Sequence, residues 1–446
     1  MHPWLLQRFR TLPPFVQKAA LSFGLRFNGL AIQFLISILV TRLLGAQSFG
    51  AFIYAFVWAT MLGTFLTFGL SRLAVREIPR FVSESDHGRA RGYLLLTIAT
   101  ILAGGVLTGL LLMVLERASI LVLAPGWLLV TAVAIAHALI LSLSGIMAGF
   151  QMIVWSNFIE NIFRQLVYAG LIGLCLLAGI TLTPQSLFAV NLAASLPTLL
   201  LMGLLILAAL RRHLPEAMPV RIDARYWFLG AMPLLLSVFA DFFNTNLDIL
   251  MIGSLMGDLE TGIYRAAVRG AMLVSIANMV SLQVLGPLLS RALAQKDTAG
   301  AQRVLAYSAL VSLAAALTLC ALLALAAHSF LALFGPEFPE AATAMRILLA
   351  GMAVNVLAGG GSILLVMLNR ETRVLMINLA GLALNVVLNA ILIRLWGIEG
   401  AAAATSLTLA FVALAILHSV KRESGFDPTV FSAWRLWRAR RARRAG

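Results

Sequence analysis

The chain has 446 residues, of which 61% are hydrophobic and 11% charged, and its mean hydropathy is +0.96. Soluble domains carry about 25% charged residues, so this composition excludes a soluble protein and predicts a polytopic membrane protein. The net charge of +15 does not indicate a nucleic-acid partner, because such binding needs a soluble basic face. Cys175 and Cys320 lie in apolar runs without ligand-like neighbours, so we expect no disulfide, no metal and no cofactor.

Long apolar runs fill almost the whole chain. At about 20 to 25 residues for each crossing of the bilayer, they add up to about twelve transmembrane helices. The expected fold class is therefore an all-α polytopic membrane protein with no large soluble domain. The predicted spans are residues 20–44, 51–74, 93–115, 121–147, 157–179, 187–210, 228–256, 262–289, 304–327, 341–368, 374–395 and 400–420.

Lysine and arginine residues gather in alternate connections between these spans. The connections on the N-terminal side of the membrane, together with the two chain ends, hold 25 of the 33 basic residues. By the positive-inside rule this side is cytoplasmic, so both termini are expected there. Residues 1–19 carry no signal-peptide pattern, and the first apolar run is expected to be an uncleaved anchor. The basic tail, residues 421–446, is either a solvated topology anchor or a segment along the anionic inner leaflet.

The first predicted helix carries a polar face. Ser22, Arg26, Gln33 and Ser37 follow spacings of four, seven and four residues, which place them on one side of a helix. Arg26 lies only about 9 Å from the start of the span at 1.5 Å per residue. Its guanidinium either reaches the cytoplasmic interface or an acidic partner, or it lines a cavity. Gln33 lies deeper, which favours the cavity.

The fifth predicted helix opens with several polar residues, among them Asn157, Glu160 and Arg164. Glu160 and Arg164 are four residues apart, so the simplest interpretation is an ion pair on one helix face. On that interpretation these charges are structural.

The most polar part of the membrane domain surrounds the seventh and eighth predicted helices. Asp241, Asn244 and Asp248 are spaced i, i+3 and i+7 and form one stripe. Arg265 and Arg269 are spaced i and i+4 on the next helix and form another. Acids and arginines at membrane depth are costly and usually functional. We therefore expect the two stripes to line a hydrated path.

A glycine-bounded polar turn occurs twice. Gly45–Gly50 is GAQSFG and Gly257–Gly262 is GDLETG, at an offset of 212 residues in a chain of 446. An offset close to half of the chain predicts a duplicated membrane domain. The Pro-containing basic connection 211–227 is the best boundary, which gives an N-terminal lobe at 20–210 and a C-terminal lobe at 228–420.

No catalytic signature accompanies these features. The sequence contains no GxxxxGK[ST] loop, no HExxH and no CxxC pattern. The outer connections are short, which leaves little room for the acceptor-binding loops of a glycan polymerase or ligase. Two repeats with a polar seam are typical of a transporter, and we expect no enzyme.

Five segments carry a resemblance to a known family: residues 23–56, 69–81 (GLSRLAVREIPRF), 248–267, 330–351 and 397–407 (GIEGAAAATSL). In this order they resemble the Wzx-type oligosaccharide flippases of the multidrug, oligosaccharidyl-lipid and polysaccharide exporter superfamily. The resemblance implies two six-helix lobes around a central cavity that opens alternately to each side. It implies transport of undecaprenyl-pyrophosphate-linked oligosaccharide to the outer leaflet of a bacterial cytoplasmic membrane. A polysaccharide polymerase and glycosyltransferases are the implied protein partners, and membrane lipids surround the chain.

The resemblance also implies roles for the polar side chains. Arg26, Arg265 and Arg269 would contact the anionic head group of the substrate. Gln33 and Asn244 would contact sugar hydroxyls.

The resemblance implies two alternative roles for the acids of the stripe formed by Asp241, Asn244 and Asp248. Asp241 and Asp248 would bind a coupling proton or sodium ion, or they would hold the arginines in place. For Asp248, the structural role is favoured.

Two other functions stay open at this point. A cation-coupled drug or metabolite exporter of the same superfamily would alter resistance and leave glycans unchanged, and its cavity would be more acidic. A non-transporting scaffold for glycan enzymes would tolerate neutral residues in place of the arginines. The arginine content favours the flippase.

Overall fold

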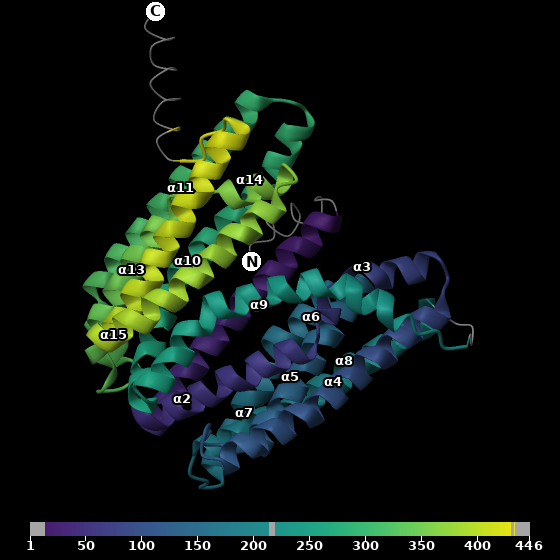
Figure 1. Cartoon of the computed structure of the whole chain (residues 1–446), viewed down its shortest axis with the longest axis vertical. Coiled ribbons are helices and arrows are strands. Elements are labelled where there is room, and N and C mark those ends of the chain that lie inside the picture. Colours follow the sequence, from purple (N-terminus) through teal and green to yellow (C-terminus); the bar gives the residue numbers. More distant parts are fainter. Residues whose placement is uncertain (1–13, 214–218, 430–431, 433–446) are drawn as a thin grey trace, which may run out of the picture. The chain divides into compact units, whose positions relative to one another are not determined.

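The computed structural model describes residues 14–213, 219–429 and 432, and every regular element within them is a helix (Figure 1). The first half of the chain forms α2 (Pro14–Leu66), α3 (Leu70–Ser83), α4 (His87–Arg117), α5 (Trp127–Gly149), α6 (Ile153–Phe158), η1 (Ile159–Phe163), α7 (Arg164–Leu177), α8 (Pro184–His213) and α9 (Ala224–Leu255). The second half forms α10 (Asp258–Ala294), α11 (Thr298–Leu325), α12 (Ala327–Ala332), η2 (Phe338–Ala341), α13 (Ala342–Val356), α14 (Gly361–Met367) and α15 (Glu371–Ser424). The arginine-rich end of the predicted tail lies outside the described residues.

The helices have the length and composition of membrane spans. Eight of them in the described chain are long and apolar enough to cross a bilayer, and counting the bent pair α13 and α14 as one span gives up to nine. The prediction of an all-α polytopic membrane protein is confirmed. The exact number of crossings stays a prediction.

Two helices are much longer than a membrane is thick, and a glycine breaks each of them. α2 has 53 residues and α15 has 54, or about 80 Å at 1.5 Å per residue, against about 30 Å for the hydrocarbon core. Gly45 (φ 73°) and Gly397 (φ 59°) interrupt them in a backbone region that glycine adopts most readily. These breaks confirm the predicted boundaries after residues 44 and 395.

The predicted span 51–74 is wrong at its end. Phe68 and Gly69 have positive φ angles of 47° and 76°, and here α2 ends and a separate helix, α3, begins. α3 buries its apolar side together with Glu77, which pairs with Arg76 at 3.0 Å. Hydropathy missed the break because apolar residues continue through it.

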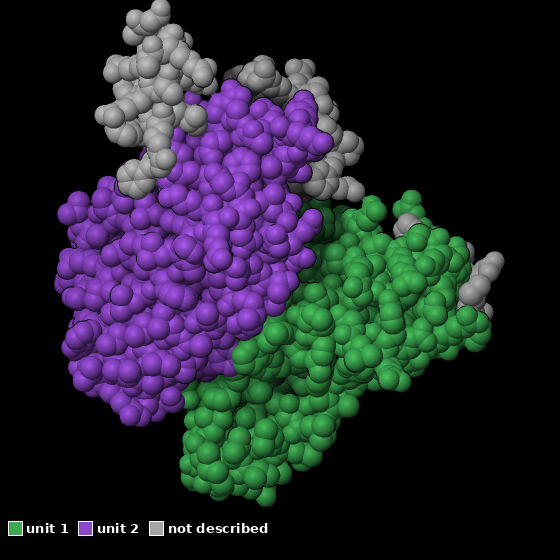
Figure 2. Space-filling model, turned by 45° about the horizontal axis from the view of Figure 1, so that its top comes forward, with its two compact units in different colours: residues 1–44, 51–239 green, residues 45–50, 240–446 purple. Residues whose placement is uncertain are grey.

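Contacts divide the chain into two compact units (Figure 2). Unit 1 holds residues 1–44 and 51–239, and unit 2 holds residues 45–50 and 240–446. The division passes through α9, between Phe239 and Ala240. The predicted lobes at 20–210 and 228–420 stay a prediction.

Helix α5 is the centre of unit 1 and packs against α3, α4 and α8. At the start of α9, the ring centroid of Trp227 lies 5.1 Å from that of Tyr93 and 6.0 Å from that of Phe81. All three side chains are buried. Edge-on aromatic pairs of this kind contribute about 0.5–1.5 kcal/mol beyond burial, so Trp227 fixes the start of α9 to α3 and α4.

Unit 2 is built from α10, α11, α13 and α15, with α13 in contact with the other three (Figure 1). The two arms of α15 lie against each other, and Asn385 donates to Thr408 across them at 3.2 Å. Asn389 donates to the Asn385 amide oxygen at 3.1 Å. Such hydrogen bonds contribute only about 0.6 kcal/mol on average between membrane helices. Side-chain packing therefore supplies most of the stability.

The two copies of the glycine-bounded turn contact each other within unit 2. A Cβ atom at Gly50 would overlap the carbonyl oxygen of Asp258, and a Cβ atom at Gly262 would overlap that of Ala46. Asp258 and Ala46 are also 212 positions apart, so the contact is reciprocal. The Ala46 N–H donates to the Glu337 carboxylate at 2.8 Å, which ties the first turn to η2.

Candidate functional site

Asp248 lies on α9, and each of its carboxylate oxygens accepts a hydrogen bond. The Tyr264 hydroxyl of α10 donates to Oδ2 at 2.7 Å, and the Ile249 N–H donates to Oδ1 at 2.9 Å. A side-chain hydrogen bond also links Tyr264 to Thr405 of α15. Asp248 is only 7% exposed and Tyr264 is fully buried. The carboxylate thus connects α9 to α10, and the tyrosine connects α10 to α15.

Arg265 and Arg269 follow on α10, one turn apart. Electrostatic interactions connect Arg265 with Asp248 and Arg269 with Arg265, so the three charges lie near one another. The Nε and Nη1 atoms of Arg265 are buried and make no hydrogen bond to any described residue. Asp248 therefore balances charge without accepting these two donors. A guanidinium with unused N–H groups is suited to bind a phosphate or carboxylate.

The predicted stripe on α9 is helical but does not share one environment. Asp248 is buried, whereas Asp241 and Asn244, two turns and one turn before it, are exposed. Asp248 lies in a buried part of α9 that Tyr264 of α10 reaches. The structure thus brings Asp248 together with the two arginines and leaves Asp241 and Asn244 on the exposed part of the helix.

Arg26 of α2 lies in unit 1 and is held by a neutral side chain. Its Nε donates to Oδ1 of Asn157 on α6 at 3.0 Å. Arg26 is exposed while Asn157 is buried, and no acid in the described part of the chain pairs with this arginine. Gln33 is half-buried two turns further along α2. The predicted alternative in which Arg26 pairs with an acid is therefore not seen in the described residues.

A π-helical turn interrupts the helix that carries the remaining polar residues of unit 1. This turn, η1, covers Ile159–Phe163, between α6 and α7. Single π turns inside α-helices are rare, and those that occur are often at functional sites. The Ser144 hydroxyl donates to Glu160 at 3.0 Å, and Arg164 donates to Asn191 at 3.3 Å. These hydrogen bonds run to α5 and α8. Glu160 and Arg164 also attract each other electrostatically, but no close ion pair between them is among the described contacts.

Sequence reasoning missed three residues that complete these clusters. Tyr264 is separated from Asp248 by a turn, so no periodicity within one helix connects the two. Ser144 lies among small and apolar residues without any distinguishing pattern. Asn191 did offer a signal, because it is the single amide in the apolar span 187–210.

Two family profiles match the chain. Residues 15–293 match the family described as polysaccharide biosynthesis protein, and residues 233–391 match the family described as MatE. The expected resemblance is confirmed at the level of the family. Comparison with curated proteins gives no match.

Several solved transporters share the fold. A multidrug resistance MATE family transporter of the MOP superfamily, inward-facing, has a TM-score of 0.74 at 14% identity, over 89% of this chain and 95% of its own. The lipid II flippase MurJ, inward closed, has a TM-score of 0.67 at 16% identity, over 91% and 87%. A MOP superfamily transporter from Pyrococcus furiosus, described as having a binding pocket of reverse polarity, has a TM-score of 0.59 at 16% identity, over 91% and 95%. The chain therefore has the fold of the MOP superfamily.

Proposed function

This chain belongs to the polysaccharide biosynthesis protein family, and on that premise we propose that it is a flippase for a lipid-linked oligosaccharide. It moves undecaprenyl-pyrophosphate-linked oligosaccharide from the inner to the outer leaflet of the bacterial cytoplasmic membrane by alternating access. Both termini face the cytoplasm. The glycosyltransferases act before it, and the polysaccharide polymerase acts on the exported lipid.

The observation that carries this proposal is the unused pair of buried donors on Arg265. Arg265 lies about two turns after the start of α10, and arginines within membrane segments are rare and usually mark a binding or transport site. The described contacts give the Nε and Nη1 atoms of Arg265 no hydrogen-bonded ion pair that would explain its place as structural, although Asp248 interacts with it electrostatically. A diphosphate head group accepts hydrogen bonds from both nitrogen atoms, and its negative charge is opposite to that of the guanidinium.

Release of the anion requires that Arg265 also tolerates the empty site. Asp248 lies within electrostatic reach and compensates the guanidinium when no anion is bound. Arg269 adds a second positive charge next to Arg265, so the group of three keeps a net positive charge toward a diphosphate. In this mechanism Asp248 positions and compensates the arginines.

The remaining predicted residues have subsidiary roles in the proposal. Arg26 contacts the head group at another stage of transport. Gln33 and Asn244 contact sugar hydroxyls, because amides both donate and accept hydrogen bonds. Asp241, exposed on α9, is the candidate for binding a coupling proton or sodium ion.

The test measures leaflet location of a fluorescent polyprenyl-diphosphate oligosaccharide in proteoliposomes. The wild-type chain and Arg265→Gln are compared at equal folded amounts. Arg346→Gln is the matched control, because Arg346 is exposed on α13 in the same unit and donates to the Ala324 carbonyl. We expect Arg265→Gln to slow transfer at least about tenfold, since a hydrogen bond to a charged group contributes about 1.5–3 kcal/mol. Equal transfer by both variants, or none by wild type, contradicts the proposal.

A cation-coupled exporter is the second candidate, and the MatE match over residues 233–391 favours it. Counter-transport of an organic cation against a sodium or proton gradient in the same proteoliposomes distinguishes the two. The paired arginines on α10 repel such a substrate, so we expect no gradient-driven uptake of cations.

A further inference from the structure

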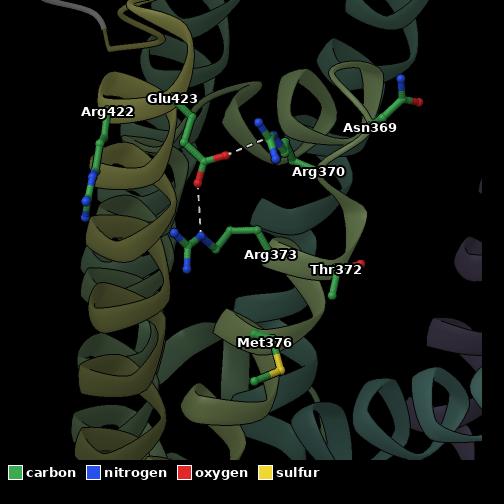
Figure 3. Close-up of a pocket in the computed structure, with 7 residues that line it drawn as sticks. All are labelled: Asn369, Arg370, Thr372, Arg373, Met376, Arg422 and Glu423. Carbon is green, nitrogen blue, oxygen red and sulfur yellow. Dashed lines mark hydrogen bonds and ion pairs between the residues drawn. The ribbon is translucent and has the colours of Figure 1, made fainter.

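A groove with a cationic end and an apolar end lies in unit 2, where the two ends of α15 come together. Its polar part has a volume of about 500 Å³ and is lined by Arg370, Arg373, Arg422 and Glu423, among others (Figure 3). An adjoining cavity of about 420 Å³ shares Arg373 and Arg422. It continues past His418 and Ser419 to the apolar side chains Ile377, Phe411, Leu414 and Ala415. The two cavities therefore form one amphipathic groove.

The polar part carries more positive than negative charge. Glu423 pairs with Arg373 Nε at 3.0 Å and with Arg370 Nε at 3.3 Å, so one carboxylate serves two guanidiniums. Arg422 forms neither a hydrogen bond nor an ion pair with the described part of the chain. The side chains of Arg370 and Arg373 are 61% and 52% exposed, against 17% for Glu423. The acid lies behind the arginines, whose surplus charge faces outward.

The apolar part has the dimensions of one lipid tail. Phe411, Ala415 and Arg422 lie at i, i+4 and i+11, on one face of α15. Eleven residues of helix cover about 16 Å, or about half of the 30 Å hydrocarbon core. Phe411 and Leu414 are 40% and 64% exposed, so the apolar wall is open to the bilayer.

We propose that this groove binds an anionic phospholipid of the cytoplasmic leaflet. Arg373 and Arg422 hold the phosphate, Glu423 orients Arg373 from behind, and one acyl chain lies along Phe411 and Ala415. A neutral lipid would leave the surplus charge unused, and a soluble phosphate would leave the apolar wall uncovered. The positive-inside pattern places this end of α15 at the cytoplasmic surface, where the leaflet is anionic. No residue of the Asp248 and Arg265 cluster takes part.

Lipid retention by the purified full chain tests the proposal. The protein is equilibrated in detergent with equal phosphatidylglycerol and phosphatidylcholine, and bound lipid is quantified by native mass spectrometry. We expect wild type to retain phosphatidylglycerol, and Arg373→Gln with Arg422→Gln to lose about fivefold in retention for each arginine. Lys421→Gln is the matched control, because Lys421 is exposed next to Arg422 but does not line the groove.

Two further arms separate the lipid from other ligands. Ala415→Phe fills the apolar part without changing charge and is expected to reduce retention as well, whereas inorganic phosphate is expected not to displace the lipid. Arg422→Gln alone breaks no described interaction. If the double variant does not fold, lipid retention by Arg422→Gln therefore tests the proposal. Equal retention of both lipids by wild type, unchanged retention in Arg422→Gln and Ala415→Phe, or displacement by phosphate overturns the proposal. A polyprenyl phosphate is added as a competitor in a separate sample, and its preferential retention over phosphatidylglycerol overturns the proposal and assigns the groove to substrate.

Discussion

The polar clusters of the two units hold arginine in different ways. In unit 1, Arg26 and Arg164 each donate to a neutral amide on another helix. In unit 2, Arg265 lies near Asp248, and its buried Nε and Nη1 atoms have no acceptor among the described residues. The number of arginines in a membrane domain therefore does not locate an anion site. What matters is whether buried N–H groups lack acceptors, as those of Arg265 do.

Asp248→Ala is expected to have the largest effect on stability. The change leaves Arg265 without its compensating charge and the Tyr264 hydroxyl without its acceptor, and breaking a buried pair in this way costs about 3–5 kcal/mol. The midpoint of thermal unfolding in detergent measures it. Asn244→Ala removes an exposed amide from the same helix and is expected to change stability by no more than about 0.5 kcal/mol. Equal midpoints for the two variants would show that Asp248 does not support the arginines.

Arg164→Gln tests the unit 1 side of the comparison. The Arg164 donor reaches Asn191 on α8, so its loss is expected to reduce stability by about 1 kcal/mol. Because this guanidinium serves a structural contact, transfer per folded molecule should stay close to wild type, unlike Arg265→Gln. The same variants are measured for unfolding midpoint and for initial transfer rate. A slow but fully stable Arg164→Gln protein would place a transport role in unit 1 as well.

Arg26→Ala is expected to have a smaller effect on transfer than Arg265→Gln. One Arg26 donor is already used by Asn157, and a hydrogen bond of about 0.5–1.5 kcal/mol corresponds to a loss of about two- to twelvefold. Arg26→Lys keeps the charge but not the planar fork of donors, so it separates the two contributions. Initial transfer rates in proteoliposomes decide between them, and an unchanged rate in Arg26→Ala removes this residue from the proposed path.

Tyr264→Phe is expected to have the smallest effect. It removes one hydrogen bond to Asp248, and such bonds between membrane helices contribute about 0.6 kcal/mol on average and about 1.7 kcal/mol at most. A double-mutant cycle with Asp248→Asn isolates the contribution of this pair. A coupling energy near zero would mean that packing alone holds the carboxylate in place.

Features that depend on one stretch of chain were predictable from the sequence. Gly45 and Gly397 mark helix breaks because few residues other than glycine adopt their φ angles, and the predicted spans separate at both positions. Arg265 and Arg269 lie together because their spacing on one helix guarantees it. The break at Phe68 was missed because an apolar residue in a left-handed conformation leaves no mark in hydropathy.

Contacts between distant helices were not predictable in the same way. Arg26 and Asn157 are 131 positions apart, and their contact depends on how α2 and α6 are rotated against each other. The partners of Glu160 and Arg164 were predicted from spacing along one helix, while neighbouring helices supply the hydrogen-bond donor of Glu160 and the acceptor of Arg164. These contacts depend on how the helices pack, and helix packing cannot be predicted from the residue pattern of a single sequence.

The reciprocal contact between the two glycine-bounded turns restricts substitution at both of them. Gly50 and Gly262 meet the main chain of the opposite turn, so each position restricts the other although 212 residues separate them. A side-chain change in one turn cannot relieve the clash caused by replacing the glycine of the other turn, because the opposing atoms belong to the backbone. Each of these two positions therefore accepts only glycine, whatever side chains stand in the opposite turn.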